Sequence, residues 1–279
     1  MAMTNMPPAA DRTVDHDDLG VDAGPGEPAL LYLSGLGSPR SMWRPLAGTT
    51  AFWRRSVAVD WRRHGTNPPG PHDYEWDDLL ADAVGVVDAL GVGTFVPVAN
   101  AHAGWVALEL ARRFPDRVPG VVLVDWMVLG PPAPFLGGLA AMRDPARWEA
   151  AVAALTASWV HGHEDVPGLV DLVEGMRANG FSTWSRAGEL ISGAFARHGS
   201  PLAAFGRLHP PVPTLHLYGD PADEGYLVAQ QVYAQSNPWF HVRRLEGARS
   251  HFPMLEAPGE IAASVEDFIR TCVLAPAAG

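Results

Sequence analysis

The chain has 279 residues, a formal net charge of −11 and 47% hydrophobic residues. This length suits one large α/β domain with an insertion, and the hydrophobic fraction suffices for a sizeable core. The acidic balance argues against nucleic acid and against an anionic membrane surface as partners, since both need a basic face on the protein.

Cysteine usage and the N-terminal composition indicate a compartment. Cys272 is the one cysteine, so no intrachain disulfide can form and a reducing cytosol is the simplest environment. The first residues lack the basic start and apolar core of a signal peptide, and no apolar run reaches the length of a membrane span. We expect a cytoplasmic monomer or homodimer, with residues 1–18 as a disordered lead-in.

Short apolar runs alternate with helical patterns along most of the chain. Helical spacing of apolar residues marks Tyr74–Leu90, about Ala103–Phe114, and Ala257–Val273. The alternation predicts an α/β fold with a doubly wound, mostly parallel sheet. The runs are typical of strands buried on both faces of such a sheet, and they are Ala29–Leu33, Ser56–Val59, Thr94–Val98, Gly120–Val124, Thr214–Leu217 and Phe240–Leu245.

The stretch 130–207 interrupts this alternation. It has no strand-like run, is rich in aromatic residues and Met, and shows helical patterns at Pro145–Leu155, Val166–Asn179 and Arg186–Arg197. We expect a helical cap there, inserted into a core formed by 19–129 and 208–279. Its His161-Gly162-His163 segment has no visible third ligand, so a loop is expected and no metal site.

The third predicted strand leads into Ala99-Asn100-Ala101-His102-Ala103. A strand, a sharp turn and a helix in this order form the nucleophile elbow, G-x-S-x-G, in which the serine attacks a carbonyl. Ala101 stands at the position of that serine, and a methyl group cannot attack. The sequence therefore predicts a hydrolase-like frame without its nucleophile.

Polar residues follow several of the predicted strands, where ligands bind in doubly wound sheets. His251 follows the last strand and is the candidate general base, since imidazole titrates near neutrality. A carboxylate would fix its tautomer, and both Asp125 and Asp220 follow strands. The backbone N–H groups of Leu36 and His102 would form an oxyanion hole.

Several stretches together resemble the cofactor-independent dioxygenases of the α/β-hydrolase fold, which cleave 3-hydroxy-4-quinolone rings. The likeness begins near Leu30 and is carried by T-F-V-P-V-A-N-A-H-A-G-W-V, V-L-V-D-W-M, S-W-V-H-G-H and S-H-F-P. It implies an α/β-hydrolase fold with a cap, His251 as base and Asp125 as its partner. It also implies that Trp126 and the cap residue Trp159 lie at a small aromatic substrate, which reacts with O2 without a metal, flavin or other cofactor.

Three departures from that family concern the substrate. The family carries Ser at the position of Ala101 and His at the positions of Asn100 and Ser38. We expect these residues to line the pocket and to favour a larger phenolic or quinone-like ring, as in bacterial biosynthesis of polycyclic aromatics. Two alternatives stay open: a ligand-binding protein on a hydrolase frame, and a lyase or isomerase that uses the base alone.

Overall fold

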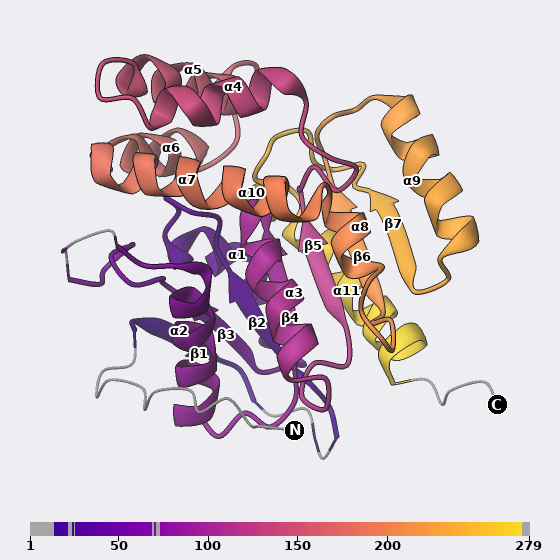
Figure 1. Cartoon of the computed structure of the whole chain (residues 1–279). Helices are drawn as coiled ribbons and strands as arrows, with labels where there is room; N and C mark the ends of the chain where they lie inside the picture. Colours follow the sequence, from indigo (N-terminus) through magenta and orange to yellow (C-terminus); the bar gives the residue numbers. More distant parts are fainter. Residues whose placement is uncertain (1–13, 22–23, 25, 69, 71–72, 275–279) are drawn as a thin grey trace, which may run out of the picture.

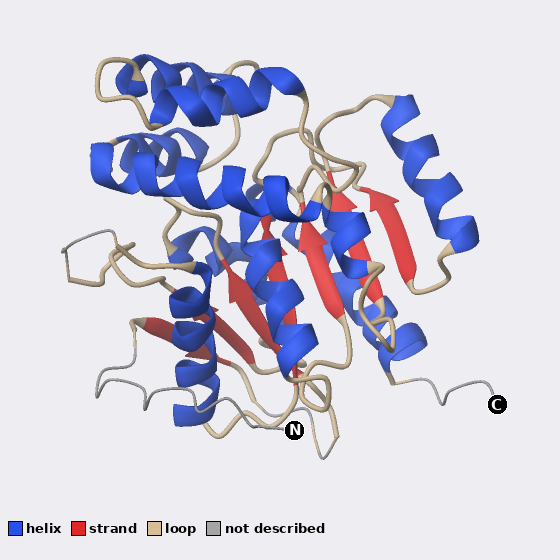
Figure 2. Ribbon diagram, viewed as in Figure 1, coloured by secondary structure: helices blue, strands red, loops and turns tan. Residues whose placement is uncertain are grey.

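The computed structural model describes residues 14–21, 24, 26–68, 70 and 73–274. Within these residues, seven strands form one sheet in the order β1-β3-β2-β4-β5-β6-β7 (Figure 2). Strand β1 runs antiparallel to β3, and every other neighbouring pair is parallel. The predicted doubly wound, mostly parallel α/β sheet is confirmed. The strands are β1 (His16–Leu19), β2 (Ala29–Leu33), β3 (Ser56–Val59), β4 (Phe95–Asn100), β5 (Val121–Val124), β6 (Thr214–Tyr218) and β7 (Phe240–Arg244).

Helices cover both faces of the sheet, which is why its central strands are buried throughout and mainly apolar. All residues of β2 to β6 are buried. In Figure 1, α2 (Trp76–Ala89) and α3 (Gly104–Arg113) lie in front of the sheet, with α1 (Arg44–Thr50) and α11 (Pro258–Phe268) behind it. The six predicted strands and three predicted core helices are confirmed, each within two residues at the start and within five at the end.

The short edge strand β1 corrects part of the predicted lead-in. Residues 1–13 lie outside the described residues, but His16 to Asp18 pair with β3 instead of being disordered. Asp17 and Asp18 form ion pairs of 3.0 and 2.8 Å with Arg40 and Arg55 of the core. An edge strand of charged residues lacks the apolar pattern by which buried strands are recognised.

A group of helices separates β5 from β6 in the chain. Helices α4 (Ala133–Met142), α5 (Trp148–Val160), α6 (Leu169–Arg177) and α7 (Phe181–His198) lie above the carboxyl ends of the strands (Figure 1). Helix α8 (Pro201–Phe205) leads back to β6. The three predicted helices of this stretch correspond to α5, α6 and α7. Helix α4 was missed because its apolar residues surround the whole axis and leave no polar face.

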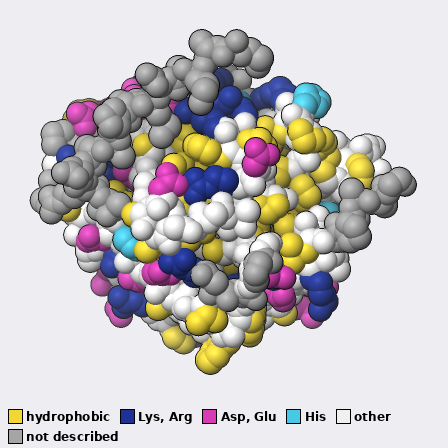
Figure 3. Space-filling model, turned by 90° about the horizontal axis from the view of Figure 1, so that it is seen from below, with side chains coloured by type: hydrophobic (Ala, Val, Ile, Leu, Met, Phe, Trp, Pro, Cys, Tyr) yellow, Lys and Arg dark blue, Asp and Glu magenta, His cyan; other side chains and the backbone are white. Residues whose placement is uncertain are grey.

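The remaining elements connect the core. Helix α9 (Glu224–Ser236) links β6 to β7, and α10 (Pro253–Glu256) precedes α11. Short turns of 3-10 helix span Arg40–Trp43 and Ala101–Ala103, and a π turn spans Ile269–Val273. No helix among the described residues is long and apolar enough to cross a membrane. On the face opposite α4–α7, acidic and basic side chains lie interspersed (Figure 3).

Candidate active site

The turn after β4 has the geometry of an elbow. Ala101 follows the strand directly with a φ of 47°, in the left-handed region that costs a non-glycine residue about 1 kcal/mol. The chain then enters α3, so the strand–turn–helix context expected of an elbow is present. Gly104 begins that helix, and a Cβ there would lie 2.2 Å from the ring of Trp126. The glycine therefore lets α3 start directly against the turn that follows β5.

Asp125 and His251 form a hydrogen-bonded pair at the ends of two strands. Asp125 follows β5 with a φ of 50° and is 4% exposed. Its Oδ2 lies 2.7 Å from Nδ1 of His251, while its Oδ1 accepts hydrogen bonds from the backbone N–H groups of Gly219 and Asp220. Because a carboxylate only accepts, Nδ1 carries the proton and the lone pair is on Nε2. His251 is thereby oriented as a proton acceptor.

The alternative partner, Asp220, has a different place. Its backbone N–H donates to Asp125 at 3.2 Å, and no hydrogen bond joins its carboxylate to His251 within the described part of the chain. Burial and the nearby Asp125 charge raise the pKa of Asp220. Its side chain lies at the rim of the cavity described below. Of the two carboxylates considered from the sequence, Asp125 contacts the histidine.

His102 is held as a neutral ring. The indole Nε1–H of Trp126 donates to Nδ1 of His102 at 3.2 Å, so the proton of the imidazole is on Nε2. The ring also stacks on Phe135 at 5.5 Å between centroids. Burial, and to a lesser extent the nearby His251, lower the pKa of His102 to about 3. His102 is therefore an uncharged donor at neutral pH.

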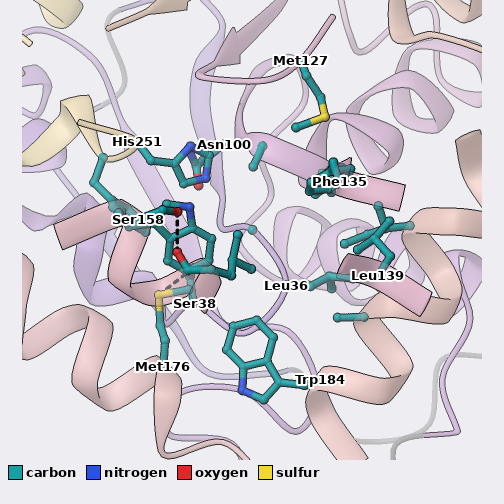
Figure 4. Close-up of a pocket in the computed structure, with 18 of the residues that line it drawn as sticks. Leu36, Ser38, Asn100, Met127, Phe135, Leu139, Ser158, Met176, Trp184 and His251 are labelled. Carbon is teal, nitrogen blue, oxygen red and sulfur yellow. Dashed lines mark hydrogen bonds between the residues drawn. The ribbon is translucent and has the colours of Figure 1, made fainter. Parts of the chain in front are cut away.

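A cavity of about 270 Å³ lies beneath the inserted helices, and His251 lines it while its partner Asp125 does not (Figure 4). The strand-end loops contribute most of its polar groups, and helices α4 to α7 contribute mainly Phe, Leu, Met and Trp side chains. The predicted site residues that line it are Leu36, Ser38, Asn100, Ala101, His102, Trp159 and His251. Trp126, which was expected at the substrate, is not among the lining residues. Its indole N–H instead donates a hydrogen bond to His102, which does line the cavity.

Besides the stacking of His102 on Phe135, other contacts at the cavity connect the inserted helices to the loops below. The indole of Trp159, on α5, stacks on the imidazole of His251 with centroids 5.3 Å apart and an interplanar angle of 16°. The hydroxyl of Ser38 donates to the sulfur of Met176, on α6, at 3.4 Å. The aromatic residue predicted from the resemblance therefore lies directly against the candidate base.

A buried network beneath the Asp125 turn was missed by the sequence reasoning. The backbone N–H of Trp126 donates to Nε2 of His216, whose Nδ1–H donates to Gln230 at 2.6 Å. The hydroxyl of Tyr226 donates to the carbonyl of Trp126 and accepts from the N–H of Val128. Burial lowers the pKa of His216 to about 4. Its position inside the apolar run T-L-H-L-Y was the available signal.

The His161-Gly162-His163 segment forms a turn between α5 and α6, as expected. His161 is exposed, and His163 lines the cavity. Within the residues that the structure describes, no group of three or more His, Cys, Asp or Glu side chains could hold a metal ion.

Comparisons with known proteins agree on one group. The model of the alpha/beta hydrolase family matches residues 30–264. The chain is 37% identical to the 2-heptyl-3-hydroxy-4-quinolone dioxygenase AqdC2 of Rhodococcus erythropolis over 92% of this chain and 95% of that protein. It is 28% identical to the 1H-3-hydroxy-4-oxoquinoline 2,4-dioxygenase of Pseudomonas putida over 88% and 93% of the two chains.

A solved structure is similar along nearly the whole chain. It is an AqdC variant in complex with its substrate, the Pseudomonas quinolone signal, and it superposes with a TM-score of 0.86 at 32% identity. The match covers 93% of this chain and 98% of that chain. The likeness therefore includes the inserted helices as well as the sheet.

Proposed function

Since the chain belongs to the α/β-hydrolase family and, within it, to the quinolone dioxygenases, we propose that it is a cofactor-independent dioxygenase of a hydroxylated aromatic ring. The substrate is a 3-hydroxy-4-quinolone or a larger ring system with an equivalent acidic hydroxyl. O2 is the second substrate, and the ring is oxidised with cleavage of a C–C bond. No metal or flavin takes part.

Proton removal is the first step. Nε2 of His251 takes the proton of the substrate hydroxyl, and the Asp125 carboxylate stabilises the imidazolium that forms. The backbone N–H groups of Leu36 and His102, at the ends of β2 and β4, stabilise the resulting oxyanion. The electron-rich anion reacts directly with O2 to give a peroxide of the substrate, which then breaks the ring bond.

One observation carries the proposal: the base is intact at an elbow that has no nucleophile. His251 lies 2.7 Å from Asp125 and lines the same cavity as Ala101. An acyl-enzyme cannot form on a methyl group. Proton abstraction, by contrast, needs only the imidazole and its carboxylate. The apolar side chains of α4 to α7 fit a flat aromatic ring and limit the access of water to its anion.

Oxygen uptake with candidate substrates tests this function. The enzyme is first freed of metals by chelation. It is then incubated under 18O2 with 3-hydroxy-4-quinolones and with larger hydroxylated aromatics, and the products are analysed by mass spectrometry. We expect 18O in a ring-cleaved product. His251→Ala should lower kcat about 10²–10⁴-fold. His161→Ala, which changes an exposed histidine of the helical insertion, serves as the matched control.

The outcomes separate the candidate reactions. Turnover that survives His251→Ala would show that the base is misassigned. Turnover that continues without O2 would replace the oxygenase by a lyase or isomerase that uses the base alone. Activity that is lost on chelation and restored by one metal would contradict the cofactor-free chemistry.

A further inference from the structure

Asn100 has a buried side-chain amide whose orientation is fixed by the hydrogen bond that it donates. It is the last residue of β4 and is 1% exposed. Its Nδ2 donates to the carbonyl oxygen of Val124, on the neighbouring strand, at 3.2 Å. A carbonyl can only accept, so the amide cannot be turned the other way without placing two acceptors against each other. The side-chain oxygen, Oδ1, therefore points away from Val124.

That oxygen belongs to the wall of the cavity. Asn100 lines it together with Gly35 and Ala101. Gly35 has no side chain to cover the amide, since a Cβ there would lie 3.3 Å from Oδ1 of Asn100 and 3.7 Å from the methyl group of Ala101. Among the described residues, none donates a hydrogen bond to this oxygen. A ligand that displaces water from this oxygen leaves it without a donor unless the ligand supplies one, so a ligand that carries a donor is favoured.

We propose that Oδ1 of Asn100 accepts a hydrogen bond from a second donor on the substrate, a ring N–H or a further ring hydroxyl, in addition to the hydroxyl that faces His251. Asn100 is then a specificity-determining residue. This inference rests on the proposed function, because the substrate is taken to be a hydroxylated ring in this cavity.

The amide differs from an imidazole in a way that matters for selection. An imidazole can change tautomer or charge and so can donate or accept at the same atom, whereas Oδ1 of Asn100 accepts at every pH. A substrate that presents an acceptor at this point leaves two acceptors facing each other in a buried site. Sites built for one hydrogen bond reject analogues without the matching group much more strongly than apolar pockets reject a change of size.

Anaerobic binding measures this selection without chemistry. Two matched pairs are titrated by fluorescence or absorbance: 3-hydroxy-4(1H)-quinolone against 3-hydroxychromone, in which oxygen replaces the ring N–H, and 1,8-dihydroxyanthraquinone against 1-hydroxyanthraquinone. In the wild-type enzyme, at least one pair should show tighter binding of the donor-bearing member by about tenfold or more. In Asn100→Leu that ratio should fall close to one. Ser158→Ala, which changes another polar lining residue, should leave the ratio as in the wild type.

Each outcome decides the proposal. Equal binding within both pairs by the wild-type enzyme overturns it, even if Asn100→Leu does not fold. A preference that persists in Asn100→Leu, or in the smaller Asn100→Ala, also overturns it. The test is independent of oxygen chemistry. Selective binding that depends on Asn100 but gives no O2 uptake would contradict the proposed function alone, and ring cleavage without that dependence would contradict this inference alone.

Discussion

The two walls of the cavity are built in opposite ways. The lower wall consists of loops at the carboxyl ends of β2, β4, β5, β6 and β7, where hydrogen bonds to neighbouring strand ends hold the side chains of Asn100, Asp125 and His251. The upper wall consists of α4 to α7, and its side chains Phe135, Leu139, Met142, Leu155 and Trp184 meet the cavity through apolar contact. The lower wall therefore presents polar atoms in fixed directions, whereas the upper wall presents an apolar surface of a given shape.

This difference indicates that proton transfer belongs to the lower wall, whereas selection for ring size belongs to the upper wall. Proton transfer needs donor and acceptor atoms within hydrogen-bond distance, which the rigid sheet supplies. A ring of a given size needs an apolar surface that can adjust, and Met is the side chain best suited to that. Changes at the His251–Asp125 pair in the lower wall should therefore affect kcat, and changes in the upper wall should affect KM and the preference for ring size.

The largest expected effect comes from breaking the lower wall at Asp125→Asn. The amide either donates to Nδ1 of His251, which reverses the tautomer, or faces the backbone donors of Gly219 and Asp220 with its own N–H group. We expect kcat to fall about 10²–10⁴-fold with little change in KM, as measured by O2 uptake. Asp220→Asn is the matched control, and an equal loss there would show that the dyad is misassigned.

Two glycines compare the packing of the walls. A Cβ at Gly104, under the lower wall, would meet the ring of Trp126 at 2.2 Å, whereas a Cβ at Gly137, on α4, would meet nothing within 4 Å. Gly104→Ala should lower the free energy of unfolding by about 1–3 kcal/mol through overpacking. Gly137→Ala should raise it by about 0.5–1 kcal/mol through helix propensity. Urea unfolding measures both, and equal effects would contradict the packing difference.

The buried histidine under the lower wall predicts a pH-dependent stability. Burial lowers the pKa of His216 from 6.5 to about 4. The unfolded chain therefore binds this proton first as the pH falls, and stability present above pH 6.5 is lost progressively toward pH 4. His216→Gln should remove on the order of 2 kcal/mol of the loss between pH 8 and pH 5. Parallel unfolding curves of variant and wild type over that range would rule this out.

The smallest effect is expected where the upper wall touches the base. Trp159→Leu removes the ring stacked on His251 but leaves the dyad in place. Aromatic stacking contributes about 0.5–1.5 kcal/mol, so kcat/KM should fall about tenfold or less. Trp148→Leu, on the same helix and packed against Phe181 away from the cavity, is the matched control. A loss as large as that of Asp125→Asn would assign chemistry to the upper wall.

The two walls also differ in how far the sequence predicts them. Asp125 directly follows an apolar strand, and His251 lies in the loop after the last strand. Parallel strands bring their carboxyl ends to one edge, so the meeting of the two residues was predictable. The choice of Asp125 over Asp220 needed the family resemblance. The burial of His216 was signalled by the apolar run around it, but its partner Gln230 was not predictable, because Gln230 lies on a helix that carried no clear pattern. Helix α4 was missed because apolar residues lie on all of its faces, so its sequence shows no helical period.

The polar edge strand and the two left-handed turns were also not predictable from the sequence. Residues 16–18 pair with the sheet through backbone groups, which composition does not reveal. Ala101 and Asp125 have φ angles of 47° and 50°, and neither residue type favours that region as glycine does. Their conformation follows from the strands and helices around them. It is therefore a property of the assembled fold and not of the local sequence.

The apolar upper wall has a consequence for the gas that the enzyme is proposed to use. Dioxygen is small and apolar, and such gases dissolve more readily in hydrocarbon than in water, as xenon does in dry protein cavities. The side chains of Phe135, Leu139, Met142 and Leu155 form such a medium beside the ring. The second substrate then needs no polar anchor of its own. The apolar surface that contacts the ring would also hold dissolved O2 next to it.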